Sequence, residues 1–356
     1  MNRYREAMEQ CAPPEGLQAR LREKVCAQKP KRRKRILLVV LAAALILCMG
    51  ANAIWDPLFI RRFGPKAAFS KLAGAVFQEV NVTAVCDDVE LTVTQALCSD
   101  SDFHLIFYYK LPDDIEVGDS PPRVHDTQYY ITGDYSWEEY RDLEREKWAE
   151  VDWTDLNSQF EYKKSSILHP VETWAGGGGS GQPSYDPETR TIRYYAYRSS
   201  LHYYDGQETT LVDLTAQPLT IYVAPPLVEQ DGEWVPVTDH PAIVTFQPVY
   251  DGPQRRSGEW SNGEIAAKVQ MSPFSLYLEA QNMGYEYYED LLKDVYLVKE
   301  NGAVSPIGLH GLAGGGTWSE LAEGCSTVTT TVHFFGITDI MEYSAVRIGE
   351  YEIALE

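Results

Sequence analysis

Two kinds of hydrophobic pattern divide the chain. Residues 36–55 form an apolar run of twenty residues without a charged side chain. At about 1.5 Å per helical residue, this run spans about 30 Å, the hydrocarbon thickness of a bilayer. From Glu79 onward, apolar and polar residues alternate in short stretches, as in strands with one buried face. The pattern therefore predicts one transmembrane helix followed by a mainly β body.

The charges beside the apolar run predict its orientation. Asp56 follows the run, whereas five cations precede it: Lys31, Arg32, Arg33, Lys34 and Arg35. The positive-inside rule then places the N-terminus in the cytoplasm and the body outside the cell, with Trp55 and Phe59 at the outer membrane interface. A signal peptide cleaved after Ala53 is the alternative, because Ala51-Asn52-Ala53 has the small-x-small form of a cleavage site. We expect a retained anchor, because a 35-residue leader before the apolar run is long for a signal peptide.

The cytoplasmic segment, residues 1–35, contains two short amphipathic patterns separated by Pro13-Pro14. Apolar residues recur at spacings of four and three before the prolines and at spacings of four after them, and helices this short are barely stable alone in water. Their apolar stripes therefore need a partner, and we expect a cytosolic protein. The alternative is a basic leader that lies along anionic lipid. The stripes, called the tail ridge below, comprise Tyr4, Met8, Leu17, Leu21 and Val25.

Strands are expected after a juxtamembrane linker at residues 56–77. Glu79–Cys86 places Val80, Val82 and Ala84 on one face, and Asp87-Asp88 then turns the chain into a second strand. In this register Cys86 faces Val89 and Cys98 faces Phe77, so the two thiols lie too far apart for a disulfide. Further strands are predicted at residues 103–110, 128–132, 191–198, 210–214, 219–223, 243–247, 264–271, 274–280, 295–299, 327–335 and 345–355.

Many short strands separated by Gly, Pro and Asp turns are typical of antiparallel sandwiches. A boundary near Pro225-Pro226 divides the exterior into a domain at residues 78–225 and a second at 226–356, with an early turn at 231–234. A helical pattern at 136–149, which begins with a capping box, is expected to be an insertion in the first domain.

The charge distribution argues against nucleic acid as a partner of the body. Residues 1–35 carry eleven Lys and Arg against four Asp and Glu, whereas the other 321 residues carry twenty against forty-eight. An acidic body repels phosphate.

The chain shows no pattern typical of an enzyme or a metal site. Its six cysteines are far apart without a CxxC pair, and its seven histidines include no HExxH. The glycine runs at 176–181 and 314–316 lack the Lys-Ser/Thr of a phosphate loop and are predicted to be loops. We therefore predict no catalytic residues, no cofactor and no metal.

Adjacent tyrosines offer a different binding chemistry outside the cell. They occur at 108–109, 129–130, 194–195, 203–204 and 287–288. Neighbouring residues of a strand point to opposite faces, so one ring of each pair would point outward, where it can stack on wall sugars. The alternative is that tyrosine is used here as a strand former whose hydroxyl reaches water.

The arrangement as a whole resembles a family. The start MNRYREAMEQCAPPEGLQARLREKV, the basic run, the single anchor, and DGEW (231–234), VQMSPFSLYLE (269–279) and VRIGEYEIALE (346–356) are similar to the single-pass anti-sigma-factor-like membrane proteins of Gram-positive bacteria, whose exteriors form a domain of unknown function. The resemblance implies immunoglobulin-like sandwiches outside and a tail that binds a sigma factor. The His-x3-Cys-x2-Cys signature of the zinc-containing anti-sigma class is absent from the sequence, so inhibition of a sigma factor would depend on the tail helices alone.

These observations together predict a non-enzymatic, single-pass regulator in the cell membrane, with a sigma factor as the cytoplasmic partner of the tail. The alternative is a structural or wall-binding surface module, with a cell-wall glycan or protein as its partner and no regulatory role.

Overall fold

The computed structural model describes residues 55–118, 120–124, 127–130, 171–172, 178–180, 183–199, 202–204, 209–211, 213–216, 218–223, 225–238, 240, 242–322 and 325–356. The predicted tail helices, the apolar run up to residue 54 and the predicted insertion at 136–149 lie outside these residues. Among the residues described, no helix is long and apolar enough to cross a bilayer. The chain divides into two units, residues 1–54 and 55–356.

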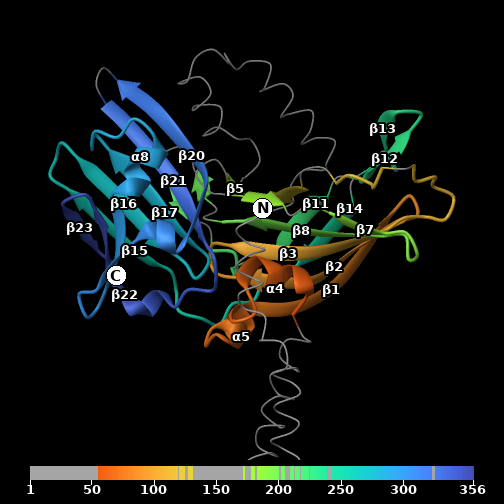
Figure 1. Cartoon of the computed structure of the whole chain (residues 1–356), viewed down its shortest axis with the longest axis horizontal. Coiled ribbons are helices and arrows are strands. Elements are labelled where there is room, and N and C mark those ends of the chain that lie inside the picture. The colour runs from red at the N-terminus through yellow and green to blue at the C-terminus, as the bar shows by residue number, and fades with distance from the viewer. Residues whose placement is uncertain are drawn as a thin grey trace, which may run out of the picture. The chain divides into compact units, whose positions relative to one another are not determined.

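This unit is mainly β with several antiparallel sheets, which confirms the predicted class (Figure 1). A first sheet has the order β1 (Phe77–Cys86), β2 (Val89–Cys98), β3 (Phe103–Lys110), β8 (Thr191–Arg198) and β6 (Gly178–Ser180), with β7 (Ser184–Asp186) also paired to β8. A second has the order β14 (Ala242–Phe246), β11 (Leu219–Val223) and β4 (Thr127–Tyr130). Side chains from both sheets share one core, among them Leu91, Phe107, Tyr194, Ile221 and Val244.

Smaller elements complete this half of the body. One three-stranded sheet has the order β10 (Thr209–Leu211), β9 (His202–Tyr204) and β5 (Val171–Glu172). A hairpin joins β12 (Leu227–Gln230) to β13 (Glu233–Pro236). Its turn at Asp231-Gly232 has φ of 54° and 83°, which confirms the turn predicted there.

The second half contains another pair of sheets. One has the order β15 (Arg256–Ser261), β16 (Ala266–Met271), β17 (Ser275–Gln281), β21 (Cys325–Phe334) and β20 (Gly311–Ala322). The other has the order β19 (Val304–Pro306), β18 (Val295–Lys299), β22 (Tyr343–Ile348) and β23 (Tyr351–Ala354). The helices α8 (Tyr288–Lys293), η2 (Ile307–Leu309) and η3 (Ile340–Glu342) connect the strands. Both sheets contribute to one core, which includes Val269, Leu278, Leu297, Val346 and Ile353.

The two halves repeat one strand order, and we call residues 77–246 the first module and residues 256–355 the second. In each, three consecutive strands and one later strand form a sheet, as β1-β2-β3-β8 and as β15-β16-β17-β21. The facing sheet contains β4-β11-β14 in the first module and β18-β22-β23 in the second. Immunoglobulin domains place their second and third strands in different sheets. The order found here therefore differs from the immunoglobulin-like order that the family resemblance implies.

Residues 56–77, expected to be a linker, instead fold onto the first sheet. They form α4 (Pro57–Phe63), η1 (Ala67–Phe69) and α5 (Ala73–Val76). The Asp56 carboxylate caps α4, proline occupies its first turn, and Gly64 ends it with φ of 79°. Phe59, Phe63 and Val76 are buried against Leu97, Ile106 and Tyr195 of the sheet. Trp55 and Phe59, expected at the membrane interface, are thus buried in the body.

The predicted β1–β2 hairpin is confirmed, with Cys86 facing Val89, but its register changes at a bulge. The extra residue lies between Glu79 and Val82, where Asn81 has φ of 50°. Phe77 therefore faces Leu97, and Cys98 pairs with Phe103 of β3. Cys86 and Cys98 are both free thiols, as predicted.

Three loop or strand predictions are wrong in detail. Gly178–Ser180 and Gly314–Gly316 belong to strands, β6 and β20, and the second run lies at a bulge in its pairing with β21. The single strand predicted at 345–355 is a hairpin, because Gly349 with φ of 57° turns the chain.

Candidate functional site

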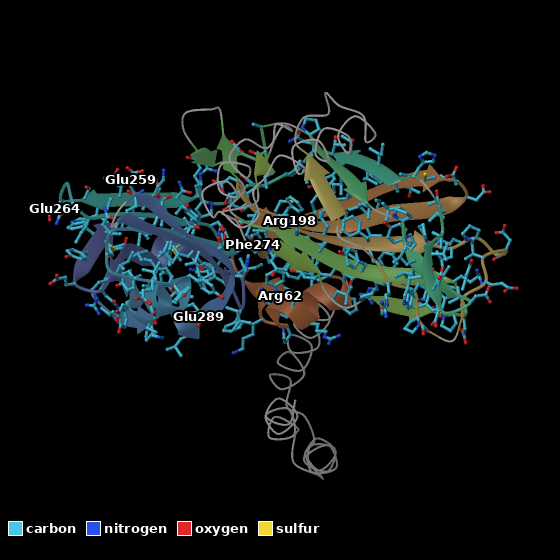
Figure 2. All side chains as sticks on the ribbon, turned by 90° about the horizontal axis from the view of Figure 1, so that it is seen from above. Arg62, Arg198, Glu259, Glu264, Phe274 and Glu289 are labelled. Carbon is cyan, nitrogen blue, oxygen red and sulfur yellow. The ribbon has the colours of Figure 1, made fainter. Side chains whose placement is uncertain are left out.

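Helix α4 contacts both modules, and the candidate site is built around this contact. We use the word junction for α4 together with the β2–β3 turn (residues 99–102) and the β16–β17 turn (residues 272–275). Arg62, Arg198 and Phe274 are labelled where the two modules meet (Figure 2). No residue of the junction was chosen as a functional residue from sequence.

The chain entering the body is held by Asp56. Its carboxylate accepts hydrogen bonds from the backbone N–H of Leu58 and from the Tyr108 hydroxyl, both at 2.8 Å, and contacts the Arg193 guanidinium. Its own N–H donates to Gln95 Oε1 at 2.7 Å. Burial, and then the hydrogen bond to Asp56, raises the pKa of Tyr108 to about 12. These contacts, the Asp56 clamp, fix the start of α4 to strands β2, β3 and β8.

The end of α4 packs into an aromatic cluster between the modules. The Phe63 ring lies 4.8 Å from that of His104 on β3 and 5.7 Å from that of Phe274 in the β16–β17 turn. His104 is fully buried, and its Nδ1 is 2.7 Å from the Tyr195 hydroxyl. Its Nε2 has no hydrogen-bond partner in the described part of the chain. Burial, and then the positive charge of Arg62, lowers the pKa of His104 well below its usual value, so this ring is neutral.

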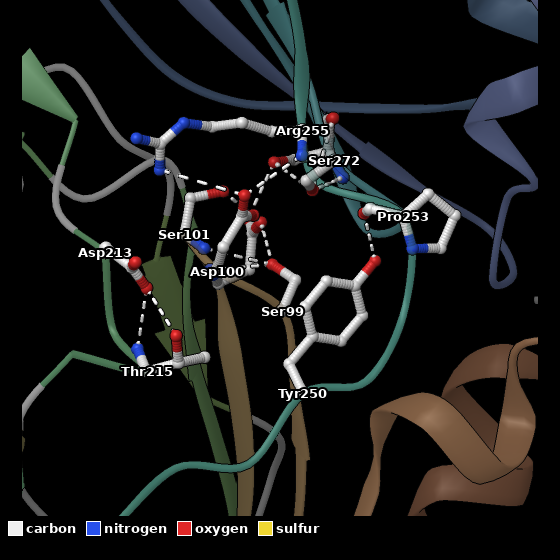
Figure 3. A network of polar contacts seen from close by, with 11 residues as sticks. Ser99, Asp100, Ser101, Asp213, Thr215, Tyr250, Pro253, Arg255 and Ser272 are labelled. Atoms are coloured by element: carbon white, nitrogen blue, oxygen red, sulfur yellow. Dashed lines mark hydrogen bonds and ion pairs between the residues drawn. The ribbon is translucent and has the colours of Figure 1, made fainter.

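The two turns of the junction, which lie side by side in Figure 3, have the same internal hydrogen bonds. Ser99 N–H donates to the Asp102 carbonyl at 2.8 Å, and Ser272 N–H donates to the Ser275 carbonyl at 2.9 Å. Each first serine also accepts, at its Oγ, the N–H groups of the residues two and three positions later. The repeated strand order therefore extends to the geometry of these turns, which occupy equivalent positions in the two modules.

Direct side-chain bonds join the two turns. Asp102 has no exposed surface, and its carboxylate accepts the hydroxyls of Ser99 and Ser101 at 2.8 Å and that of Ser275 at 2.6 Å. Beside this contact, Ser199 Oγ lies 3.1 Å from Nδ1 of His333. His333 pairs with Ser275 across strands of the second module, and Ser199 directly follows Arg198, which pairs with Phe103. Equivalent positions of the two modules are thus bonded to each other.

The connection between the modules, residues 247–255, is fixed to the same place. Asp100 Oδ2 accepts the N–H of Arg255 at 2.9 Å, and the Asp100 carbonyl accepts the N–H of Leu214 at 2.8 Å. The Tyr250 hydroxyl donates to the Pro253 carbonyl at 2.5 Å. Burial raises the pKa of Asp100, and the Arg255 N–H and guanidinium oppose that rise.

The polar groups of the junction are buried and bonded to one another, which suits a structural contact between the two modules. Ser199 and His333 resemble a nucleophile–base pair, yet their exposed fractions are 0% and 2%. The described residues line surface hollows at other places, including one of about 920 Å³ lined by residues 113–118 and 229–231 among others. No group of three His, Cys, Asp or Glu side chains in the described ranges is placed to hold a metal ion.

The residues predicted from sequence to bind partners lie elsewhere. The tail ridge and Lys31–Arg35 are outside the described residues. Tyr109 and Tyr194 are in the first-module core, and Tyr195, on the opposite face, is buried beneath α4. These rings are not open to sugars, because both faces of the sheet are covered at that point. Tyr287 is exposed but precedes α8 rather than lying in a strand.

Comparison with known proteins identifies no family for this chain. No family model matches the chain, and no curated protein matches its sequence. A crystal structure described as the conserved domain protein from Bacillus anthracis is similar over 82% of this chain and 83% of that one, with 11% sequence identity and a TM-score of 0.41.

Proposed function

We propose that this chain is a single-pass membrane regulator, with a cytoplasmic tail that binds a sigma factor and an extracellular body of two β-sandwich domains. One observation in the body supports this function: the start of the described chain is fixed by the Asp56 clamp, and α4 contacts both modules. A surface module that only displays a binding face needs no such rigid attachment next to its anchor.

The clamp suits a regulator because it removes a flexible joint. In a free linker, backbone rotations absorb any movement of the body before it reaches the anchor. Here Phe63 packs on His104 of one module and on Phe274 of the other, so a change in how the modules meet must repack α4. Close-packed interfaces transmit such shifts because they do not deform continuously.

The domain boundary in this proposal differs from the one predicted near residue 225. Strand β14 (Ala242–Phe246) pairs with β11 and packs in the first core, so the first domain extends to it. Residues 247–255 then connect the two domains.

The tail is tested in the full chain, purified in detergent from its own cells. Wild-type protein should retain a sigma factor that mass spectrometry identifies. Leu21→Asp should lose it, because burial of each apolar side chain of the ridge stabilises the complex by about 1.5 to 3 kcal/mol and a charged side chain at this position removes that contribution. Ala19→Asp is the matched control, since residue 19 lies on the other side of the same predicted helix.

Two outcomes would count against the tail proposal. The first is a wild-type chain that retains no sigma factor. The second is dependence on Lys31–Arg35 alone, which would indicate a basic leader on lipid.

A further inference from the structure

The segment that carries α4, η1 and α5 has a charge opposite to that of the rest of the body. Residues 57–78 contain four cations, Arg61, Arg62, Lys66 and Lys71, and no Asp or Glu. The 278 residues that follow contain sixteen Lys and Arg against forty-seven Asp and Glu. The acidic body thus begins, after Asp56, with a segment whose only charges are positive.

Folding of this segment separates its apolar and cationic residues. Phe59, Phe63 and Val76 are buried against the first sheet, so one side of the segment faces that sheet. Arg61, Lys66 and Lys71 are exposed, and Arg62 is half-buried beside the Phe63 and Tyr197 rings.

None of the four cations forms an ion pair with a residue that the structure describes. Asp339 and Glu342 line a surface hollow with Lys71, and the Glu342 carboxylate is bonded to Lys299 at 2.7 Å. The hydrogen bond from Lys299, and to a lesser extent the charge of Lys71, lowers the pKa of Glu342. Cations that form no ion pair leave a positive surface that an anionic partner would complement.

An apolar side chain lies among the cations. Phe69, between Lys66 and Lys71, has 47% of its surface exposed although most of η1 is buried. An exposed aromatic ring beside lysines is the composition that binds the headgroup region of a bilayer.

We propose that the exposed side of residues 57–72 binds the anionic phospholipid headgroups of the bilayer and so holds the body against the membrane. This inference rests on the proposed anchor at residues 36–55. Arg61 is six residues after Trp55, at most about 20 Å of extended chain, so the segment lies close to the end of the proposed anchor. The Asp56 clamp adds to this, because it fixes the segment's orientation relative to the sheet.

The test uses the full chain in nanodiscs, of phosphatidylglycerol or of phosphatidylcholine alone, and measures lysine acetylation by mass spectrometry. In phosphatidylglycerol, Lys66 and Lys71 should be acetylated about fivefold more slowly, since each basic residue near an anionic surface gains about 1 kcal/mol of binding, a factor of about five at 25 °C. NaCl at about 1 M, where the Debye length is about 3 Å, should abolish the difference. The exposed Lys110 and Lys293 should react equally in both lipids.

A pair of double variants assigns the effect to this surface. Arg61→Gln with Lys66→Gln should restore rapid acetylation of Lys71, whereas Lys110→Gln with Lys293→Gln should leave its protection unchanged. Equal acetylation of Lys66 and Lys71 in the two lipids would overturn the inference while leaving the anchor intact. A chain that does not enter nanodiscs at all would instead overturn the anchor and this inference together.

Discussion

The bond between the two turns of the junction gives a direct test of how the modules are held together. Ser275→Ala removes the hydroxyl that donates to Asp102 Oδ1 at 2.6 Å, across 173 residues of sequence. The substitution deletes one oxygen atom and keeps the strand. Its effect on stability therefore reports the polar contacts of that hydroxyl, which also lies 3.3 Å from Ser272 Oγ, rather than a change in apolar packing.

The expected cost follows from the environment of Asp102. A hydrogen bond to an ionised group contributes about 1.5 to 3 kcal/mol, and its loss is most costly where water cannot replace it. Asp102 has no exposed surface and keeps two other hydroxyl donors, Ser99 and Ser101. We therefore expect Ser275→Ala to lower the free energy of unfolding by about 2 kcal/mol.

Urea unfolding of the full chain in detergent, followed by tryptophan fluorescence, measures this loss. Ser184→Ala on β7 is the control, because Ser184 is exposed, and it should change the free energy of unfolding by less than about 0.5 kcal/mol. In a double-mutant cycle with Asp102→Asn, the two substitutions should be non-additive by more than about 1 kcal/mol. A Ser275→Ala protein as stable as the Ser184→Ala protein would refute the role assigned to the junction.

Three further predictions concern the junction and the thiols. Asp56→Asn should lower the pKa of Tyr108 from about 12 while burial keeps it above 10, as ultraviolet titration would show. Below pH 6.5 the unfolded state gains a proton at His104 that the folded state does not, so this residue lowers the free energy of unfolding as the pH falls, by up to about 1.4 kcal/mol per pH unit. His104→Gln should reduce the slope in urea titrations by that amount. In the folded protein, iodoacetamide should modify Cys86 and spare Cys98, because burial raises the pKa of Cys98 to about 12. Peptide mapping by mass spectrometry measures this, and modification of Cys98 in preference to Cys86 would contradict it.

The strands were predictable where apolar and β-branched residues are dense along the chain. The bounds of β3, β8, β11 and β18 were predicted as found, because their apolar and β-branched residues form compact runs between turn residues. Strands β6 and β20 were missed because glycine carries no side-chain pattern.

The junction could not be predicted from sequence. The turns Ser99–Asp102 and Ser272–Ser275 each have a serine three residues before a polar partner, a common local motif that says nothing about its distant neighbour. Their contact depends on how two modules pack. The helices at 57–76 were missed because each is short and their buried face is recognisable only once the sheet beneath them is known.

The central claim, a single-pass chain with its tail inside and its body outside, is tested by a membrane-impermeant lysine reagent on intact, wall-stripped cells. Lys110 and Lys293, exposed on the body, should react before lysis. Lys24 and Lys29 of the tail should react only after lysis. Tail lysines that react in intact cells, or a body released into the medium with a new N-terminus at Ile54, would contradict the claim.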